Sequence, residues 1–179
     1  MGNDRNAPAW RVSQWFNTPQ AIDLSSLRGK VVVLEAFQML CPGCVSHALP
    51  QMQRVRAGFP DDRVAVIGLH TVFEHHAAMT PLALEAFLHE YRIDFPVGVD
   101  EPSSDGPIPA TMRAYGMRGT PTTLLFDAQG CLREHHFGAI GDLVIGAQVA
   151  TLLAEANSVP DMMCAEREAP ACRLPTSAA

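Results

Sequence analysis

Two cysteines separated by two residues are the groups in this chain best suited to chemistry. The motif Cys41-Pro42-Gly43-Cys44 follows an apolar, β-branched run and precedes apolar residues at helical spacing. The first turn of a helix carries partial positive charge and free N–H groups, which stabilise a thiolate placed there. A second thiol one turn further along can attack a mixed disulfide and release the partner. The spacing therefore predicts a nucleophile at Cys41 and a resolving thiol at Cys44.

The same pair has a second interpretation as half of a zinc site. Zinc needs about four ligands. The other two would have to come from Cys164 and Cys172, whose eight-residue spacing is not that of a compact zinc knuckle. The position of the motif between a strand and a helix favours redox chemistry. We therefore expect no metal at Cys41 and Cys44.

Hydrophobic periodicity indicates the elements that position the motif. Residues 31–37 form an apolar run of strand length after a turn, which is typical of a buried central strand. Apolar residues then recur at helical spacing until Gly58 and Pro60. The other expected strands are 64–69, 95–99, 122–126 and 131–137, and the other expected helices are 81–91, 110–115 and 143–156. The last two strands are separated by a turn, so we expect them to pair as a hairpin.

This alternation of strands and helices indicates an α/β fold with a central mixed sheet and helices on both faces. A length of 179 residues suits one domain. We expect an N-terminal arm at 1–9, a single domain at 10–156 and a loose, irregular C-terminal tail at 157–179. Residues 10–16 are expected either as an edge strand or as an irregular lead-in.

The charge balance and hydropathy exclude some classes of partner. The chain has 13 basic and 19 acidic residues and a net charge of −6, which argues against nucleic-acid binding. No apolar stretch is long enough for a membrane span, so we expect no membrane partner. The N-terminus lacks the pattern of a signal peptide. We expect a cytoplasmic protein, or a periplasmic one if a leader has been removed.

Two further stretches complete a family pattern. Gly119-Thr120-Pro121-Thr122 enters a predicted strand, and residues 27–33 (Leu-Arg-Gly-Lys-Val-Val-Val) come shortly before the dithiol motif. Together with the order strand, Cys-x-x-Cys, helix, they resemble a thioredoxin-fold protein of the TlpA-type or redoxin (AhpC/TSA-like) branch. The resemblance covers about residues 10–156. It implies a thioredoxin-like α/β fold with an insertion at roughly residues 70–100.

The resemblance also implies roles for residues around the dithiol. Pro121 would follow a cis peptide bond and face the two cysteines. The backbone of Thr120 would pair with an extended segment of the substrate. Pro42 and Gly43, between the cysteines, would contribute to substrate binding.

Glu35 is the one charged residue in the apolar run before the motif. It lies six residues before Cys41, where thioredoxins hold a buried acid. A buried carboxyl group has a raised pKa and can accept a proton near neutral pH. We expect Glu35 to accept the proton of Cys44. The alternative is a carboxylate near the strand end that reaches solvent.

Three positions depart from the typical thioredoxin pattern. Leu40 stands where a tryptophan usually precedes the first cysteine, and the intervening dipeptide is Pro42-Gly43 rather than Gly-Pro. Both differences bear on the redox potential. Pro50 follows Cys44 by six residues instead of five, which predicts altered helix geometry just below the site.

The preferred hypothesis is a thiol–disulfide oxidoreductase that runs as a reductase, with an antioxidant role. Cys41 would attack a disulfide-containing protein or small molecule, and Cys44 would resolve the mixed disulfide. No NADPH or flavin motif is recognisable. We therefore expect no bound cofactor, and an electron-donor protein that recycles the dithiol.

Two other classes of function remain as alternatives. A peroxiredoxin-like thiol peroxidase needs Thr or Ser three residues before its cysteine and Pro seven residues before it. Before Cys41 these places hold Gln38 and Leu34. A non-enzymatic protein that binds a soft metal such as copper would use Cys41, Cys44 and His47 as ligands. A half-exposed helix histidine is the simpler interpretation of His47.

The remaining histidines and cysteines carry weaker signals. Five histidines gather in two segments: His70, His75, His76, His135 and His136. Their spacing matches no compact ligand set, so we interpret them as solvated surface. We interpret Cys131 as a bystander that acts as a small hydrophobic residue in a strand. Cys164 and Cys172 either form a disulfide in the tail or have no special role.

Overall fold

The structure, a computed structural model, describes residues 7–158. Its strands are β1 (Val12–Phe16), β2 (Val31–Phe37), β3 (Val64–His70), β4 (Val97–Asp100), β5 (Thr122–Phe126) and β6 (Leu132–Phe137). Its α-helices are α1 (Leu49–Gly58), α2 (Pro81–Glu90), α3 (Ala110–Ala114) and α4 (Asp142–Ser158), with short helical turns η1 (Ser25–Leu27) and η2 (Cys44–Ala48). Strands and helices alternate along the chain, as predicted for an α/β fold.

The strands of the described residues form one mixed sheet in the order β1-β4-β3-β2-β5-β6. Strands β2, β3 and β4 run parallel to one another, whereas β1, β5 and β6 pair antiparallel with their neighbours. The carboxyl ends of the three parallel strands therefore meet at one edge of the sheet. The predicted mixed sheet and the predicted hairpin of β5 and β6 are both confirmed.

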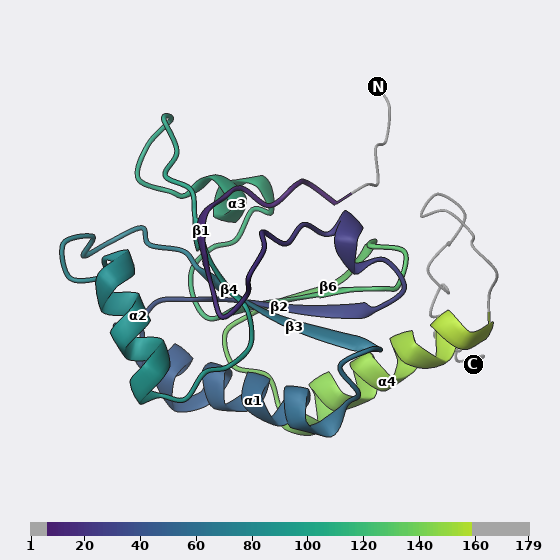
Figure 1. The fold of residues 1–179 in the computed structure, drawn as a ribbon. Coiled ribbons are helices and arrows are strands. Elements are labelled where there is room, and N and C mark those ends of the chain that lie inside the picture. The colour runs from purple at the N-terminus through teal and green to yellow at the C-terminus, as the bar shows by residue number, and fades with distance from the viewer. Residues whose placement is uncertain (1–6, 159–179) are drawn as a thin grey trace, which may run out of the picture.

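Helices cover both faces of the sheet, as predicted. Helices α1, α2 and α4 pack on one face and bury residues such as Met52, Leu84 and Val149 against it. Helix α3 and the N-terminal segment cover the other face, where Met112 and Trp10 pack. Figure 1 shows α1 and α4 on one side of the sheet and α3 on the other.

Strand β2 lies between β3 and β5, and every residue in it is buried. Successive side chains of a strand point to opposite faces. Val31 and Val33 therefore enter one core, while Val32 and Leu34 enter the other. A strand that is covered on both faces needs an apolar residue at nearly every position. This accounts for the unbroken run that marks β2 in the sequence.

Two segments differ from the sequence prediction. The helix after the dithiol begins with the separate turn η2 before α1 starts at Leu49. His70, expected in a solvated loop, is instead the last residue of β3 and only 1 % exposed. The solvated-surface interpretation is therefore wrong for His70. It fails because β4 pairs with β3 as far as this residue, a long-range contact that a polar flanking sequence conceals.

None of the helices within residues 7–158 combines the length and the apolar character needed to cross a bilayer. The predicted C-terminal tail from residue 159 onward lies outside the described residues.

Candidate functional site

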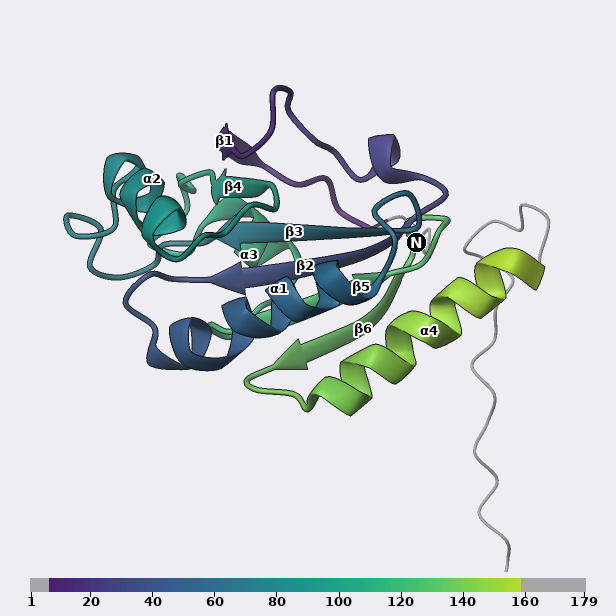
Figure 2. The ribbon, with the colours of Figure 1, turned by 60° about the horizontal axis from the view of Figure 1, so that its bottom comes forward.

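The site is built at the carboxyl edge of the parallel strands. Strand β2 ends at Phe37, and residues 38–43 lead into η2 and α1 (Figure 2). The buried Gln38 side chain donates a 3.1 Å hydrogen bond to the carbonyl of Thr71. The N–H of Thr71 donates in turn to the carbonyl of Phe37 at 3.1 Å. These bonds hold the loop before the dithiol against the segment that follows β3.

The turn η2 is a π-helix. Pro50 lacks an N–H, and in a regular α-helix its ring would clash with the carbonyl of Ser46, four residues earlier. A π-helical turn is wider than an α-helical one, and such turns are frequent at functional sites. The altered geometry that the position of Pro50 predicts is therefore present directly below the dithiol.

The two thiols differ in exposure. Cys41 is half-buried and Cys44 is 0 % exposed, and both are free. The N–H of Cys44 donates to Sγ of Cys41 at 3.3 Å, and the Cys41 thiol donates to the carbonyl of Thr120 at 3.5 Å. Burial raises the pKa of the Cys44 thiol far above its ordinary value, and the neighbouring Cys41 raises it further. Cys41 therefore has the access that a nucleophile needs, whereas Cys44 must lose its proton before it can react.

The loop before β5 faces the dithiol. The peptide bond between Thr120 and Pro121 is cis, in agreement with the family resemblance. A Cβ atom on Gly43 would lie 3.5 Å from the ring of Pro121. The fold thus brings Cys41, Gly43 and this loop into contact, although they are about 80 residues apart in sequence. Pro42 lies at the exposed end of the turn.

Glu35 is fully buried, at 0 % exposure. It points to the same face of β2 as Val33 and Phe37, and that face forms the core in which Cys44 is buried. Its Oε2 accepts a 2.7 Å hydrogen bond from the Thr123 hydroxyl. Oε1 is buried and has no partner. Burial raises the pKa of Glu35 to about 8, and the hydrogen bond from Thr123 opposes this shift.

Within residues 7–158, no hydrogen bond joins Glu35 to Cys44. A proton that passes between them needs one bridging group, and a single water is enough for general base catalysis. The unpartnered Oε1 is the atom of Glu35 that is available to such a water. The alternative of a solvent-exposed carboxylate is wrong, because both β3 and β5 flank the strand at this point.

Thr123 is a site residue that the sequence interpretation missed. It lies directly opposite Glu35 in the antiparallel pairing of β2 and β5. Its only sequence signal is its place two residues after Pro121. Register between strands 88 residues apart depends on tertiary pairing, so the spacing by itself does not reveal the contact.

The histidines do not complete a ligand set with the dithiol. The ring of His47 is hydrogen-bonded through Nε2 to the carbonyl of Ile140 at 3.0 Å. His75, His76 and His135 are exposed. Across the described part of the chain, no three His, Cys, Asp or Glu side chains gather closely enough to hold a metal ion.

Cys131 is disulfide-bonded. The interpretation of this residue as a small hydrophobic bystander did not include this bond. Neither Cys41 nor Cys44 is its partner, since both are free. Cys131 comes just before β6, in the turn that joins it to β5, whereas the dithiol follows the far end of β2. Cys164 and Cys172 lie outside the described residues.

Solved structures with similar folds support the thioredoxin-like assignment. The thioredoxin-like superfamily protein SPOA0173 is 64% identical, with a TM-score of 0.81, over 83% of this chain and 96% of that protein. A thiol-disulfide isomerase from Corynebacterium glutamicum is 47% identical, with a TM-score of 0.79, over 83% of this chain and 97% of that protein. The thioredoxin-like fold is thereby established.

Characterised relatives are longer than this chain. Protein DipZ of Mycobacterium bovis is 33% identical over 129 residues, which is 71% of this chain but only 17% of DipZ. The thiol-disulfide oxidoreductase ResA of Halalkalibacterium halodurans is 25% identical over 126 residues, 70% of this chain and 64% of ResA. The chain therefore spans less than two thirds of either relative.

The model of the AhpC/TSA family matches residues 4–135. That range contains β2, the dithiol, the cis-proline loop and β5. It covers well over half of the sequence. The chain therefore belongs to the AhpC/TSA family.

Proposed function

We propose that the protein is a thiol–disulfide oxidoreductase in which Cys41 and Cys44 react and Glu35 moves a proton. One observation carries the proposal. The accessible Cys41 sulfur lies between the N–H of Cys44 and the carbonyl of Thr120, with a buried second thiol one turn away. The names of ResA and of the Corynebacterium isomerase describe the same chemistry in those relatives.

In the first step the Cys41 thiolate attacks one sulfur of the substrate disulfide. A bond forms between Cys41 Sγ and that sulfur, and the substrate S–S bond breaks. The other substrate sulfur leaves as a thiolate and takes a proton from solvent. The N–H of Cys44, 3.3 Å from Cys41 Sγ, stabilises the attacking anion.

In the second step Cys44 resolves the mixed disulfide. Glu35, in its carboxylate form, accepts the thiol proton of Cys44 through a water at Oε1. The Cys44 thiolate then attacks Cys41 Sγ, an intramolecular disulfide forms, and the second substrate thiolate is released. Two electrons have passed to the substrate. An electron-donor protein returns the dithiol to its reduced form.

Substrate binding uses the loop that faces the dithiol. The backbone of Thr120 pairs with an extended segment of the substrate, while Pro42 and Gly43 form the opposite wall. Pro42 is exposed and Thr120 is half-buried, so both are accessible to a partner. The substrate is a disulfide in a protein or a small molecule.

The direction we propose is reduction of the substrate, and the reduction potential of the dithiol decides it. For the compartment we favour the periplasmic alternative over the cytoplasmic one. A disulfide at Cys131 is the supporting observation, since such bonds persist in oxidising compartments and are rare in the cytosol. The antioxidant role follows only if the substrates are oxidatively damaged thiols.

A redox titration tests the proposal. The protein is equilibrated in thiol buffers of graded potential, and peptides that contain Cys41 and Cys44 are counted as free or oxidised by alkylation and mass spectrometry. We expect the two to titrate together as one two-electron couple. A midpoint of about −270 mV would assign a reductase and one of about −120 mV an oxidant. If no Cys41–Cys44 disulfide forms at any potential, the proposal is wrong.

Cys44→Ser provides a second readout. With the resolving thiol removed, Cys41 should remain attached to the substrate, and the mixed disulfide should accumulate as a stable adduct. Cys41→Ser should form none. The pair of variants distinguishes nucleophile from resolving thiol independently of the potential.

A further inference from the structure

An aromatic ring lies exposed beside the substrate-facing loop. Phe137, the last residue of β6, is 49% exposed. It pairs with Thr122, and the N–H of Gly138 donates to the carbonyl of Pro121 at 2.9 Å. A Cβ atom on Gly119 would lie 3.0 Å from the Phe137 ring. The ring therefore lies against the backbone that leads into Thr120.

An arginine covers part of this ring. The guanidinium carbon of Arg118 is 4.9 Å from the centre of the Phe137 ring, a cation–π contact. Arg118 is exposed, and it forms no ion pair with any carboxylate within residues 7–158. The contact orients the guanidinium and leaves its charge free to bind an anion.

The side chain of His135 lies close enough to Arg118 to sense its charge. His135 lies two residues before Phe137, on the same face of β6. Burial lowers the pKa of His135, and the charges of His136 and Arg118 lower it further, so Arg118 acts at short range on this face. Glu134 approaches His136 at 3.6 Å and belongs to the other face of the strand.

A second exposed apolar residue lies on the dithiol side. Leu40 is 57% exposed and directly precedes Cys41. Leu40, Arg118 and Phe137 thus border the two segments that meet at the Cys41 sulfur, and we name these three residues the recognition rim. Large exposed apolar side chains at a functional site are typical of interaction surfaces.

We propose that the recognition rim selects disulfide-containing polypeptides that carry an apolar and an acidic residue close to the reacting cysteine. This inference rests on the proposed function. The apolar side chain packs on Phe137, and the carboxylate pairs with Arg118, which covers that ring. The whole chain has a net charge of −6, so the rim is a local cationic spot on an acidic molecule. Acidic segments are therefore directed to this spot rather than bound generally.

The position of the acidic residue follows from the backbone. Arg118 precedes Thr120 by two residues, so their Cα atoms lie at most about 7 Å apart. A segment that pairs with Thr120 therefore brings Arg118 within reach of residues up to about two or three positions from its paired residue. Aromatic and arginine side chains are the types that contribute most at interfaces, so both rim residues are suited to this role.

The test compares three disulfide peptides that differ at a single position near the cysteine, which holds Glu, Gln or Lys. For the wild-type protein we expect kcat/KM to be about 3- to 10-fold higher for the Glu peptide than for the Lys peptide, since an exposed ion pair contributes little energy. Arg118→Gln should bring the ratio close to one, and Arg118→Glu should reverse it. Phe137→Ser should lower kcat/KM for all three peptides.

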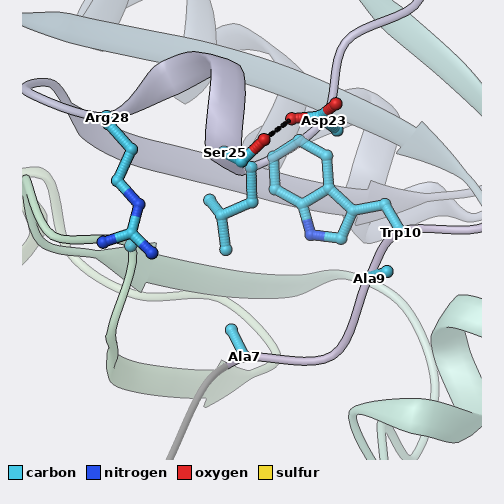
Figure 3. A pocket seen from close by; sticks show the side chains of 8 residues that line it. Ala7, Ala9, Trp10, Asp23, Ser25 and Arg28 are labelled. Atoms are coloured by element: carbon cyan, nitrogen blue, oxygen red, sulfur yellow. Dashed lines mark hydrogen bonds between the residues drawn. The ribbon is translucent and has the colours of Figure 1, made fainter.

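Arg28→Glu is the matched control. Arg28 is also exposed and without an ion pair in the described part of the chain, and it lines a pocket together with Trp10, Ser25 and Asp23 (Figure 3). Arg28 comes before β2 and Cys41 comes after β2, so Arg28 and Cys41 are separated by the length of this strand, about 20 Å. Arg28→Glu makes the same change in net charge and should leave the Glu-to-Lys ratio unchanged.

The outcomes separate the two proposals. If the wild-type protein exchanges disulfides but shows equal kcat/KM for the three peptides, the rim proposal is overturned and the proposed function stands. If no peptide and no small neutral disulfide is exchanged, the proposed function itself has failed. A concentration-dependent dimer, detected by sedimentation and lost in Phe137→Ser, would assign the rim to a second copy of the chain and would also overturn the proposal.

Discussion

Two buried carboxylates lie within the same sheet, and their surroundings differ. Asp100, at the end of β4, accepts hydrogen bonds from the Thr71 hydroxyl at 2.9 Å and from the N–H groups of Thr111 at 2.8 Å and Met112 at 2.9 Å. Glu35, in β2, accepts one, from Thr123. Burial raises the pKa of both carboxyl groups.

The difference lies in how many donors oppose burial. The donors around Asp100 satisfy both of its oxygens and fix the start of α3 to the end of β4. Glu35 keeps one buried oxygen without a partner, and the pKa of its carboxyl reaches about 8. A carboxyl group with a full set of donors stabilises structure, whereas one with a missing partner is suited to exchanging a proton near neutral pH.

The largest expected effect is on the rate at which the mixed disulfide is resolved, which should depend on Glu35 but not on Asp100. Glu35→Gln removes the proposed proton acceptor while keeping an oxygen for Thr123, so the resolution step should slow by about 100-fold or more. Asp100→Asn should change that rate by less than about twofold, because no step involves Asp100. Rapid-quench alkylation of the mixed disulfide measures resolution directly. Equal losses in the two variants would contradict the distinction.

A second effect concerns stability and its dependence on pH. The folded pKa of Glu35, about 8, lies above its ordinary value of 4.5. The unfolded chain therefore releases this proton first, and stability falls as the pH rises from about 4.5 to about 8. A glutamine does not titrate, so Glu35→Gln does not lose stability in this way as the pH rises. The Tm of Glu35→Gln minus the Tm of the wild type should therefore be larger at pH 9 than at pH 5. Thermal melts at both pH values provide the measurement, and a constant difference would count against the buried, neutral acid.

The third prediction concerns the contribution of Asp100 to the stability of the fold. Asp100→Asn replaces one acceptor oxygen by an NH₂ group that faces the donors of Thr71, Thr111 or Met112. A buried donor left without an acceptor costs about 1–3 kcal/mol. Urea denaturation should show a lower midpoint for this variant. An unchanged midpoint would mean that the corner between β4 and α3 does not depend on these bonds.

The smallest expected effect tests the single donor to Glu35. Thr123→Val keeps the shape of the side chain but removes the hydroxyl that stabilises the carboxylate. The pKa of Glu35 should rise, and the pH midpoint of the resolution rate should move up by about one unit, which corresponds to ~1.4 kcal/mol. Thr123→Ser retains the donor and should restore the wild-type midpoint. A general loss of rate in Thr123→Val, without a shift in the pH profile, would indicate a packing role.

Local hydrophobic patterns were enough to predict most of the fold. The run at 31–37 predicts β2 with correct bounds, and residues 122–126 likewise predict β5. Both strands lie in the centre of the sheet, where burial on two faces leaves an unmistakable apolar run. The bounds of β3 and β4 were less accurate, because pairing between these strands extends β3 to His70, a residue type that seldom marks a buried strand end.

Some features of the candidate site can likewise be recognised from local sequence, and others cannot. The dithiol, Glu35 and the loop at Thr120 and Pro121 are recognisable along the chain, since each is a short motif beside a predicted strand. The disulfide state of Cys131 was not predicted, because a lone cysteine gives no information on its partner.

The sequence by itself indicated the dithiol, the strand and helix that position it, and the order in which the two thiols are exposed, because these depend on neighbours within one or two helical turns. Tertiary structure decided which groups meet across the sheet. Thr123 faces Glu35 because of the β2–β5 register, and Phe137 lies beside Gly119 because of the β5–β6 hairpin. Pairing register is set by the packing of whole strands, and a shift of one residue would turn each of these side chains to the opposite face.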